Sequence, residues 1–92
     1  MPNRNQDVPE EYIEHGRVMA HAIGARIRQR RRQLKLTQKQ VQVRLELESV
    51  HISRPRFSRL ERGAYLPDAV EIVGLSKTLE VSYRWLLEGI EE

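Results

Sequence analysis

The sequence Ile-Ser-Arg-Pro-Arg-Phe-Ser-Arg-Leu-Glu-Arg-Gly, residues 52–63, predicts a short helix with well-marked ends. Ser53 is expected at the N-cap, because its hydroxyl can accept a hydrogen bond from an early backbone N–H. Pro55 fits the first turn, where its missing N–H costs nothing. Gly63 fits the position just after a helix, which is often left-handed. We therefore expect a helix over about residues 54–62.

This helix has two unlike sides. Phe57, Leu60 and Glu61 recur at helical spacing and predict a side that packs against the rest of the protein. The other side is polar and mostly cationic: Arg54, Arg56, Ser58, Arg59 and Arg62. Arginine-rich helical faces are usually solvated surface, but this one also suits the DNA major groove, where a guanidinium can form two hydrogen bonds to guanine.

Length and composition limit the classes of protein. Ninety-two residues are enough for one small domain. Cysteine is absent, which excludes disulfides and thiolate chemistry and favours an intracellular protein. The sequence has neither an apolar run long enough for a membrane span nor a signal-peptide core, so we expect a cytoplasmic location.

The charges are segregated along the chain. The net charge is only +3, but no acidic residue occurs from His15 to Leu45. That stretch carries nine cations: Arg17, Arg26, Arg28, Arg30, Arg31, Arg32, Lys35, Lys39 and Arg44. Such segregation predicts one positive face for a polyanion. An interfacial membrane helix is disfavoured, because the basic segment lacks a bulky apolar face.

The pattern predicts helices throughout and no strands. Asp7 is the expected cap of the first helix, and residues 1–6 are expected to be disordered. Residues 9–34 fit either one long helix or a short helix followed by a longer one from near Val18. Gly16 and Gly24 would weaken a continuous helix by roughly 1 kcal/mol each.

The later helices have clear start signals. Thr37 is expected to cap a helix that buries Val41 and Leu45, with Leu47 as a further candidate. Asp68 and Glu71 form a capping box for the next helix. A last short helix follows Val81-Ser82, and its Trp85 and Leu86 are expected to close the core.

This order of signals resembles the lambda-repressor-like helix-turn-helix family, of the Cro/repressor or Xre type. The matching residues run from Ile23 to Gly89. They comprise Ile23-Gly24-x-Arg26-Ile27-Arg28 with Arg31, Leu36-Thr37-Gln38-x-x-Val41, Ile52-Ser53 with Phe57-Ser58-x-Leu60-Glu61-x-Gly63, Pro67, Leu75, and Leu79-x-Val81-Ser82-x-x-Trp85-Leu86-Leu87. The resemblance implies an all-α, five-helix DNA-binding domain. We place that domain at residues 18–92, after an N-terminal extension at 1–17 that is partly disordered or helical.

The resemblance also implies roles in DNA binding. The second and third helices would form the helix-turn-helix, with the third helix in the major groove. Base contacts would come from Arg54, Pro55, Arg56 and Arg59, with Ser53 and Ser58 close by. Phosphate contacts would come from Thr37, Gln38 and Lys39 at the start of the second helix, and from Arg62.

In related repressors an arginine of the first helix pairs with the glutamate that ends the third. Here these residues are Arg31 and Glu61, and the resemblance implies a largely buried, bidentate ion pair between them. The alternative is that both are separate surface charges.

The chain departs from the family pattern in four places. Gln42 stands where a small residue is usual. The connection between the second and third helices is about five residues longer than usual and has no glycine at residues 48–51. Lys35 and Glu80 replace frequent glycines, so either position is a candidate for a left-handed conformation.

The sequence shows no catalytic pattern, and we expect neither enzymatic activity nor a cofactor. His15, His21 and His51 lack metal-ligand spacing. The leading interpretation is a prokaryotic or phage transcriptional regulator, a repressor that binds double-stranded DNA as a homodimer. Two alternatives stay open: an antitoxin-type regulator that also binds a protein toxin or co-regulator, and a protein-interaction adaptor on the same fold.

Overall fold

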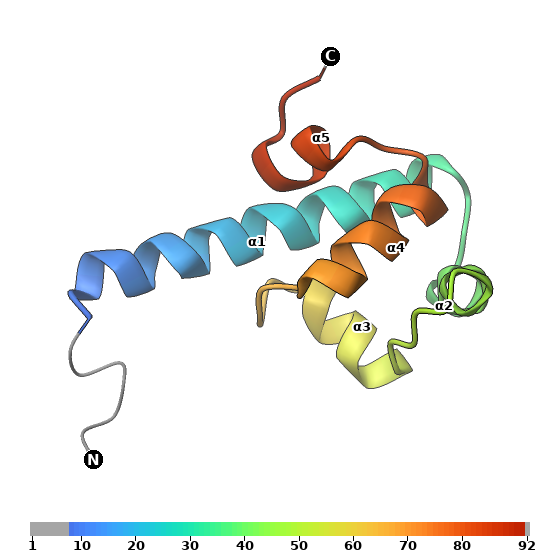
Figure 1. Ribbon diagram of the computed structural model, residues 1–92, viewed down its shortest axis with the longest axis horizontal. Coiled ribbons are helices and arrows are strands. Elements are labelled where there is room, and N and C mark those ends of the chain that lie inside the picture. The colour runs from blue at the N-terminus through green and yellow to red at the C-terminus, as the bar shows by residue number, and fades with distance from the viewer. Residues whose placement is uncertain (1–7, 92) are drawn as a thin grey trace.

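The computed structural model describes residues 8–91, which form five α-helices and no β-strand. The helices are α1 (Glu10–Gln33), α2 (Gln38–Leu47), α3 (Arg54–Glu61), α4 (Ala69–Leu79) and α5 (Tyr83–Glu88). In Figure 1, α1 runs across the molecule with α3 below it, α5 above it and α4 in front of it. The predicted all-α class is confirmed for these residues. None of their helices is both long enough and apolar enough to cross a membrane.

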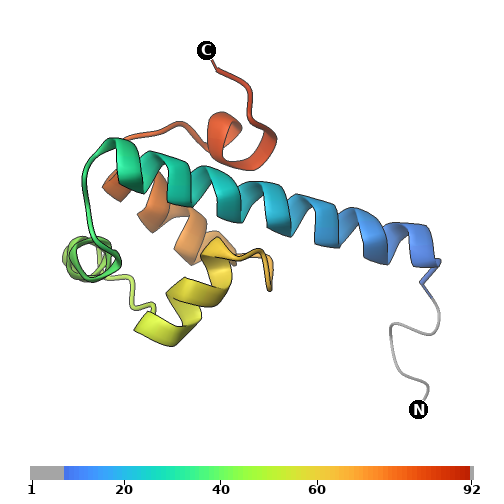
Figure 2. The same ribbon diagram turned by 180° about the vertical axis from the view of Figure 1, so that it is seen from behind.

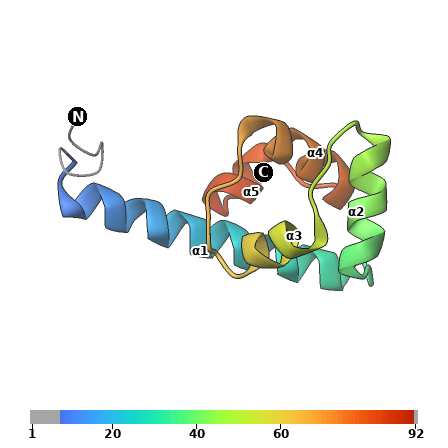
Figure 3. The ribbon, with the colours of Figure 1, turned by 90° about the horizontal axis from the view of Figure 1, so that it is seen from below.

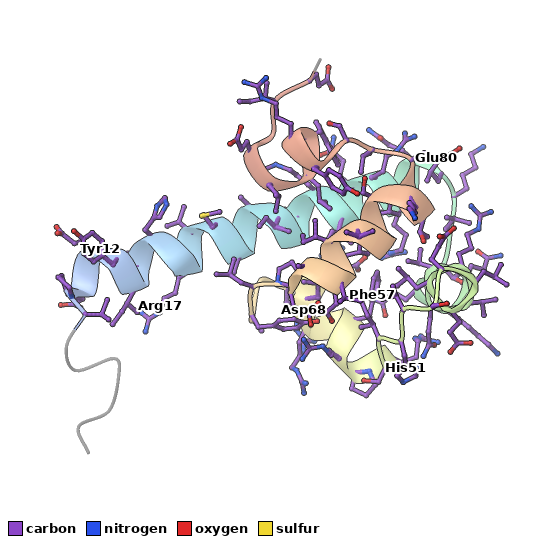
Figure 4. All side chains as sticks on the ribbon, in the orientation of Figure 1. Tyr12, Arg17, His51, Phe57, Asp68 and Glu80 are labelled. Atoms are coloured by element: carbon purple, nitrogen blue, oxygen red, sulfur yellow. The ribbon has the colours of Figure 1, made fainter. Side chains whose placement is uncertain are left out.

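Helix α1 is continuous over 24 residues, so the structure selects the single long helix of the two arrangements. Its N-cap is Pro9, without a side-chain hydrogen bond. The expected cap Asp7 and the expected disordered residues 1–6 lie outside the described residues. The first turns of α1 extend beyond the other helices, where Figure 4 labels Tyr12 and Arg17.

Gly24 lies where α1 crosses α3. A Cβ atom at this position would lie 2.3 Å from the carbonyl oxygen of Leu60 and 2.8 Å from that of Glu61. Any larger residue would therefore push the end of α3 away from α1. Gly63, with φ of 78°, lies equally close to α1, because a Cβ atom there would be 2.6 Å from the Cα of His21. These two glycines set how closely α3 and the turn after it approach α1.

The predicted helix starts at Thr37, Ser53 and Asp68 are confirmed. Each side-chain oxygen accepts a hydrogen bond from the backbone N–H three residues later. At Thr37 and Asp68 the side chain of that third residue, Gln40 or Glu71, also accepts a bond from the cap's own N–H. Both are complete capping boxes, so α2 and α4 begin at fixed residues.

The core takes one apolar side from each helix. Its buried members are Ile23, Ile27, Val41, Leu45, Val50, Ile52, Phe57, Leu60, Ile72, Leu75, Leu79 and Leu86. Figure 4 shows Phe57 pointing inward from α3, and Trp85 packs against this core while staying partly exposed. The suggested burial of Leu47 is wrong, because its side chain is 82% exposed. Leu47 follows Leu45 by two residues, which turns it to nearly the opposite side of α2.

Three residues other than glycine have left-handed backbone conformations. Lys35 and Glu80, with φ of 59° and 58°, are the two candidates from the sequence, and both are confirmed. Ser49, with φ of 61°, was not predicted. It lies in the connection between α2 and α3, residues 48–53. This connection contains residues beyond the usual family length. The turn at Ser49 is followed by Val50, which is buried in the core.

Candidate nucleic-acid interface

Helix α3 packs by one side and leaves the other side open. Phe57 and Leu60 are fully buried, whereas Arg54, Pro55 and Arg59 are exposed. In the view from below, α3 lies in front of α1 (Figure 3). The cap at Ser53 fixes where the helix begins, and therefore which residues fall on its exposed side. The result is a short helix that presents two arginines and a proline to solvent.

Glu61, at the end of α3, is held by side chains from two other segments. Arg31 of α1 donates two hydrogen bonds to it, from Nε to Oε2 at 2.7 Å and from Nη2 to Oε1 at 2.9 Å. Gln38, the first residue of α2, donates a third from Nε2 to Oε1 at 3.0 Å. The side chains of Arg31 and Glu61 are only 12% and 3% exposed. The pair is therefore buried and bidentate in the structure.

This network connects the two helices that the family resemblance predicts to contact DNA. Arg31 also donates a hydrogen bond from Nη1 to the carbonyl oxygen of Leu36, in the turn before α2. The hydrogen bonds to Glu61 raise the pKa of Arg31 above its ordinary value, against the lowering effect of burial. Arg31 thus stays charged and fixes the start of α2 relative to the end of α3.

Arg56 has partners within the protein that sequence reasoning missed. It donates two hydrogen bonds to Glu71 of α4, from Nε to Oε2 at 2.8 Å and from Nη2 to Oε1 at 3.1 Å. Its guanidinium lies 4.1 Å from the ring centre of Tyr65, whose hydroxyl also donates to Glu71. Arg56 is still 40% exposed, and its Nη1 is directed to neither carboxylate oxygen. A bidentate base contact through the occupied edge would require Arg56 to leave Glu71.

The remaining predicted contact residues flank α3. Thr37 and Lys39 are exposed at the start of α2, and Gln38 is half-buried beneath Glu61. Arg62 is exposed at the end of α3 and donates a 3.4 Å hydrogen bond to the hydroxyl of Ser58. The bond between Gln38 and Glu61 brings the start of α2 beside the end of α3. A ligand that lies along α3 would therefore meet both helices.

Comparison with protein families finds a match to the family described as Helix-turn-helix domain, over residues 24–92. The match covers three quarters of the chain. The chain belongs to this family. Comparison with curated proteins finds no match, and comparison with solved structures finds none. A helix-turn-helix domain indicates a DNA-binding regulator, so the exposed side of α3 and the start of α2 form the candidate interface.

The contacts among Arg56, Tyr65 and Glu71 come with shifted pKa values for Tyr65 and Glu71. Burial and the neighbouring Glu71 carboxylate raise the pKa of Tyr65 to about 12. Burial alone would raise the pKa of Glu71, but hydrogen bonds from Arg56 and the Asp68 N–H, with the charge of Arg56, lower it overall. The carboxylate therefore stays ionised and the phenol stays protonated near neutral pH.

The histidines give no sign of another kind of site. His15, His21 and His51 are all exposed, and His51 lies 3.6 Å from the carboxylate of Glu46. Within residues 8–91, no three His, Asp or Glu side chains form a group that could hold a metal ion. The arrangement offers hydrogen-bond donors and positive charge on a rigid surface, which suits binding.

Proposed function

We propose that this protein is a sequence-specific transcriptional regulator of the lambda-repressor-like, Xre type, acting as a repressor. Helix α3 enters the major groove, and Arg54 and Arg59 read base edges. Pro55 offers an apolar contact, for example to a thymine methyl group. The observation that carries the proposal is the exposure of these three residues on a helix whose other side is buried.

Two further groups would contact the DNA backbone. The start of α2 presents unpaired backbone N–H groups together with Thr37, Gln38 and Lys39, a combination that attracts phosphate. Arg62 and Ser58 extend the contact at the far end of α3. Such contacts position a protein on DNA without specifying sequence. Arg56, bound to Glu71, would act mainly by orienting α3 on α4.

The proposal includes a homodimer on a two-fold operator. Helix α3 has only eight residues, so one copy makes few base contacts. Two copies on successive turns of the same DNA face supply the missing specificity.

Selection of bound duplexes from a randomised DNA pool tests the proposal. We expect a two-fold sequence motif and a preference over random duplex of roughly a thousandfold or more. Arg54→Ala and Arg59→Ala should each relax the preference at one position of each half-site. Arg84→Ala is the matched control, because Arg84 is also exposed and belongs to α5, on the opposite side of α1 from α3. Enrichment of no motif would overturn the proposal.

A further inference from the structure

One face of α1 is uncovered along most of its length, and the turn at Gly63 approaches it beside His21. Figure 2, seen from behind, shows α1 in front of α4, with α3 below it and α5 above it, and all three helices contact α1. We call this the outer face of α1. It consists of Glu11, Glu14, Val18, His21, Ala22, Ala25, Gln29 and Arg32. All are exposed except Ala22, which is half-buried, and Val18 is 57% exposed.

The residue positions of the outer face are arranged symmetrically about the middle of the face. Counting from the midpoint between His21 and Ala22, position 18 mirrors 25, position 14 mirrors 29, and position 11 mirrors 32. The charges at the mirrored ends are opposite: Glu11 mirrors Arg32. Near the middle, the small apolar residues Val18 and Ala25 mirror each other. A second α1 running antiparallel would therefore place Glu11 against Arg32 and Val18 against Ala25.

A groove beside this face is lined by cations. It is open, has a volume of about 870 Å³, and lies between the second half of α1 and the end of α3. Arg28, Arg32 and Arg62 line it, and its one carboxylate, Glu61, is already bound to Arg31. The groove therefore offers positive charge to an acidic segment. The first turns of α1, with Glu10, Glu11 and Glu14, are such a segment.

We propose that the outer face of α1 binds the outer face of a second copy of this chain, with the two helices antiparallel. Glu11 of each copy then lies against Arg32 of the other, and Val18 lies against Ala25. Alanine and valine at the centre allow the helix axes to approach closely. This inference rests on the proposed function only in one respect: it names the interface of the homodimer proposed there.

The symmetry of such a pair fixes where its two α3 helices lie. The two-fold axis of an antiparallel helix pair is perpendicular both to the helices and to the line that joins them. In Figure 1 α1 is horizontal and its outer face points backward, so the axis is vertical. Rotation about a vertical axis keeps α3 below α1 in both copies. Both α3 helices would then lie on the same side of the helix pair.

The contact should be weak and sensitive to salt. It involves one helix of roughly 36 Å from each copy, given a rise of about 1.5 Å per residue. That places it at the small end of specific interfaces. Its charged ends are exposed, so added salt screens them. We expect dissociation to increase as the salt concentration rises.

Charge exchange tests the antiparallel register without DNA, by sedimentation equilibrium of the full chain at low salt. Glu11→Arg alone and Arg32→Glu alone each place like charges together at both ends, and should weaken the dimer by at least about tenfold. An equal mixture of the two variants should re-form a dimer. In that mixed dimer, one end keeps the native pair of Arg32 with Glu11. At the other end the arginine introduced at position 11 meets the glutamate introduced at position 32. Failure of the mixture to associate, or unchanged dimers of the single variants, would overturn the proposal.

Cross-linking gives a second test, since the chain has no cysteine of its own. Ala22→Cys places a thiol next to the two-fold axis and should form an intermolecular disulfide on mild oxidation. Val18→Cys is the matched control, because its two copies would be about 10.5 Å apart along the helices and should not cross-link. Equal cross-linking of both variants would contradict the register. DNA binding is measured separately, so loss of the dimer with retained specific DNA binding would refute this interface alone.

Discussion

Replacing Glu61 by glutamine tests the network that joins α1, α2 and α3. The substitution keeps the size of the side chain and removes its charge. Arg31, 12% exposed, would lose its counter-charge and one of its two hydrogen bonds to residue 61, because an amide has a single acceptor oxygen. Gln38 would compete for that same oxygen. The result is an uncompensated guanidinium in a largely dry site.

The expected loss of stability is large for a domain of this size. Breaking a buried ion pair from one side costs about 3–5 kcal/mol. For a domain of 60–100 residues, each kcal/mol lowers the melting temperature by about 4–8 °C. We therefore expect Glu61→Gln to lower the melting temperature by at least about 12 °C.

Thermal unfolding followed by circular dichroism measures this change. Glu46→Gln is the control, because Glu46 is 53% exposed and its substitution should alter stability by no more than about 0.5 kcal/mol. The double variant Arg31→Met with Glu61→Leu should be more stable than either single change, since no buried charge remains. An unchanged melting temperature for Glu61→Gln would refute the reasoning, whatever the double variant does.

Three further predictions follow from the backbone and from Tyr65. Gly24→Ala should destabilise the protein by more than about 1 kcal/mol, whereas Gly16→Ala, whose Cβ would meet its nearest neighbour at 3.9 Å, should stabilise it by about 0.5–1 kcal/mol in denaturant unfolding. Glu80→Gly should raise the melting temperature, because it relieves about 1 kcal/mol of strain at φ of 58°; a lower one would contradict this. Tyr65→Phe should remove a phenolate absorbance step near pH 12. Because folding raises this pKa, its contribution to stability is complete below pH 10 and lost as the pH rises through 12.

Features that depend on neighbouring residues were predictable from the sequence. Caps at Thr37, Ser53 and Asp68 need only a side chain and the next turn of backbone, and all three are present. The left-handed conformations of Lys35 and Glu80 followed from comparison with a family pattern. Helical spacing also predicts the exposure of Leu47, because it lies two residues after the buried Leu45.

Features that depend on distant residues were not predictable in the same way. From its neighbours in the sequence, Gly24 is expected only to weaken the helix. Its role becomes clear from the crossing with α3, where a larger side chain would not fit. The hydrogen bonds from Arg56 to Glu71 span fifteen positions between two helices. The sequence pattern explains Glu71 fully as part of a capping box, so it gives no sign that Glu71 also binds Arg56. The pairing of Arg31 with Glu61 was suggested by the family resemblance and not by spacing.

The measurement that tests the central claim most directly is DNA affinity across a salt series, for a selected duplex and a random duplex of equal length. We expect Arg54→Ala and Arg59→Ala to lower affinity for the selected duplex by about 1–3 kcal/mol each and to leave random binding nearly unchanged. Arg62→Ala should weaken both duplexes alike and reduce the salt slope by about one. If Arg54→Ala and Arg59→Ala behave like Arg62→Ala, then α3 contacts only the DNA backbone, and sequence reading by this helix is contradicted.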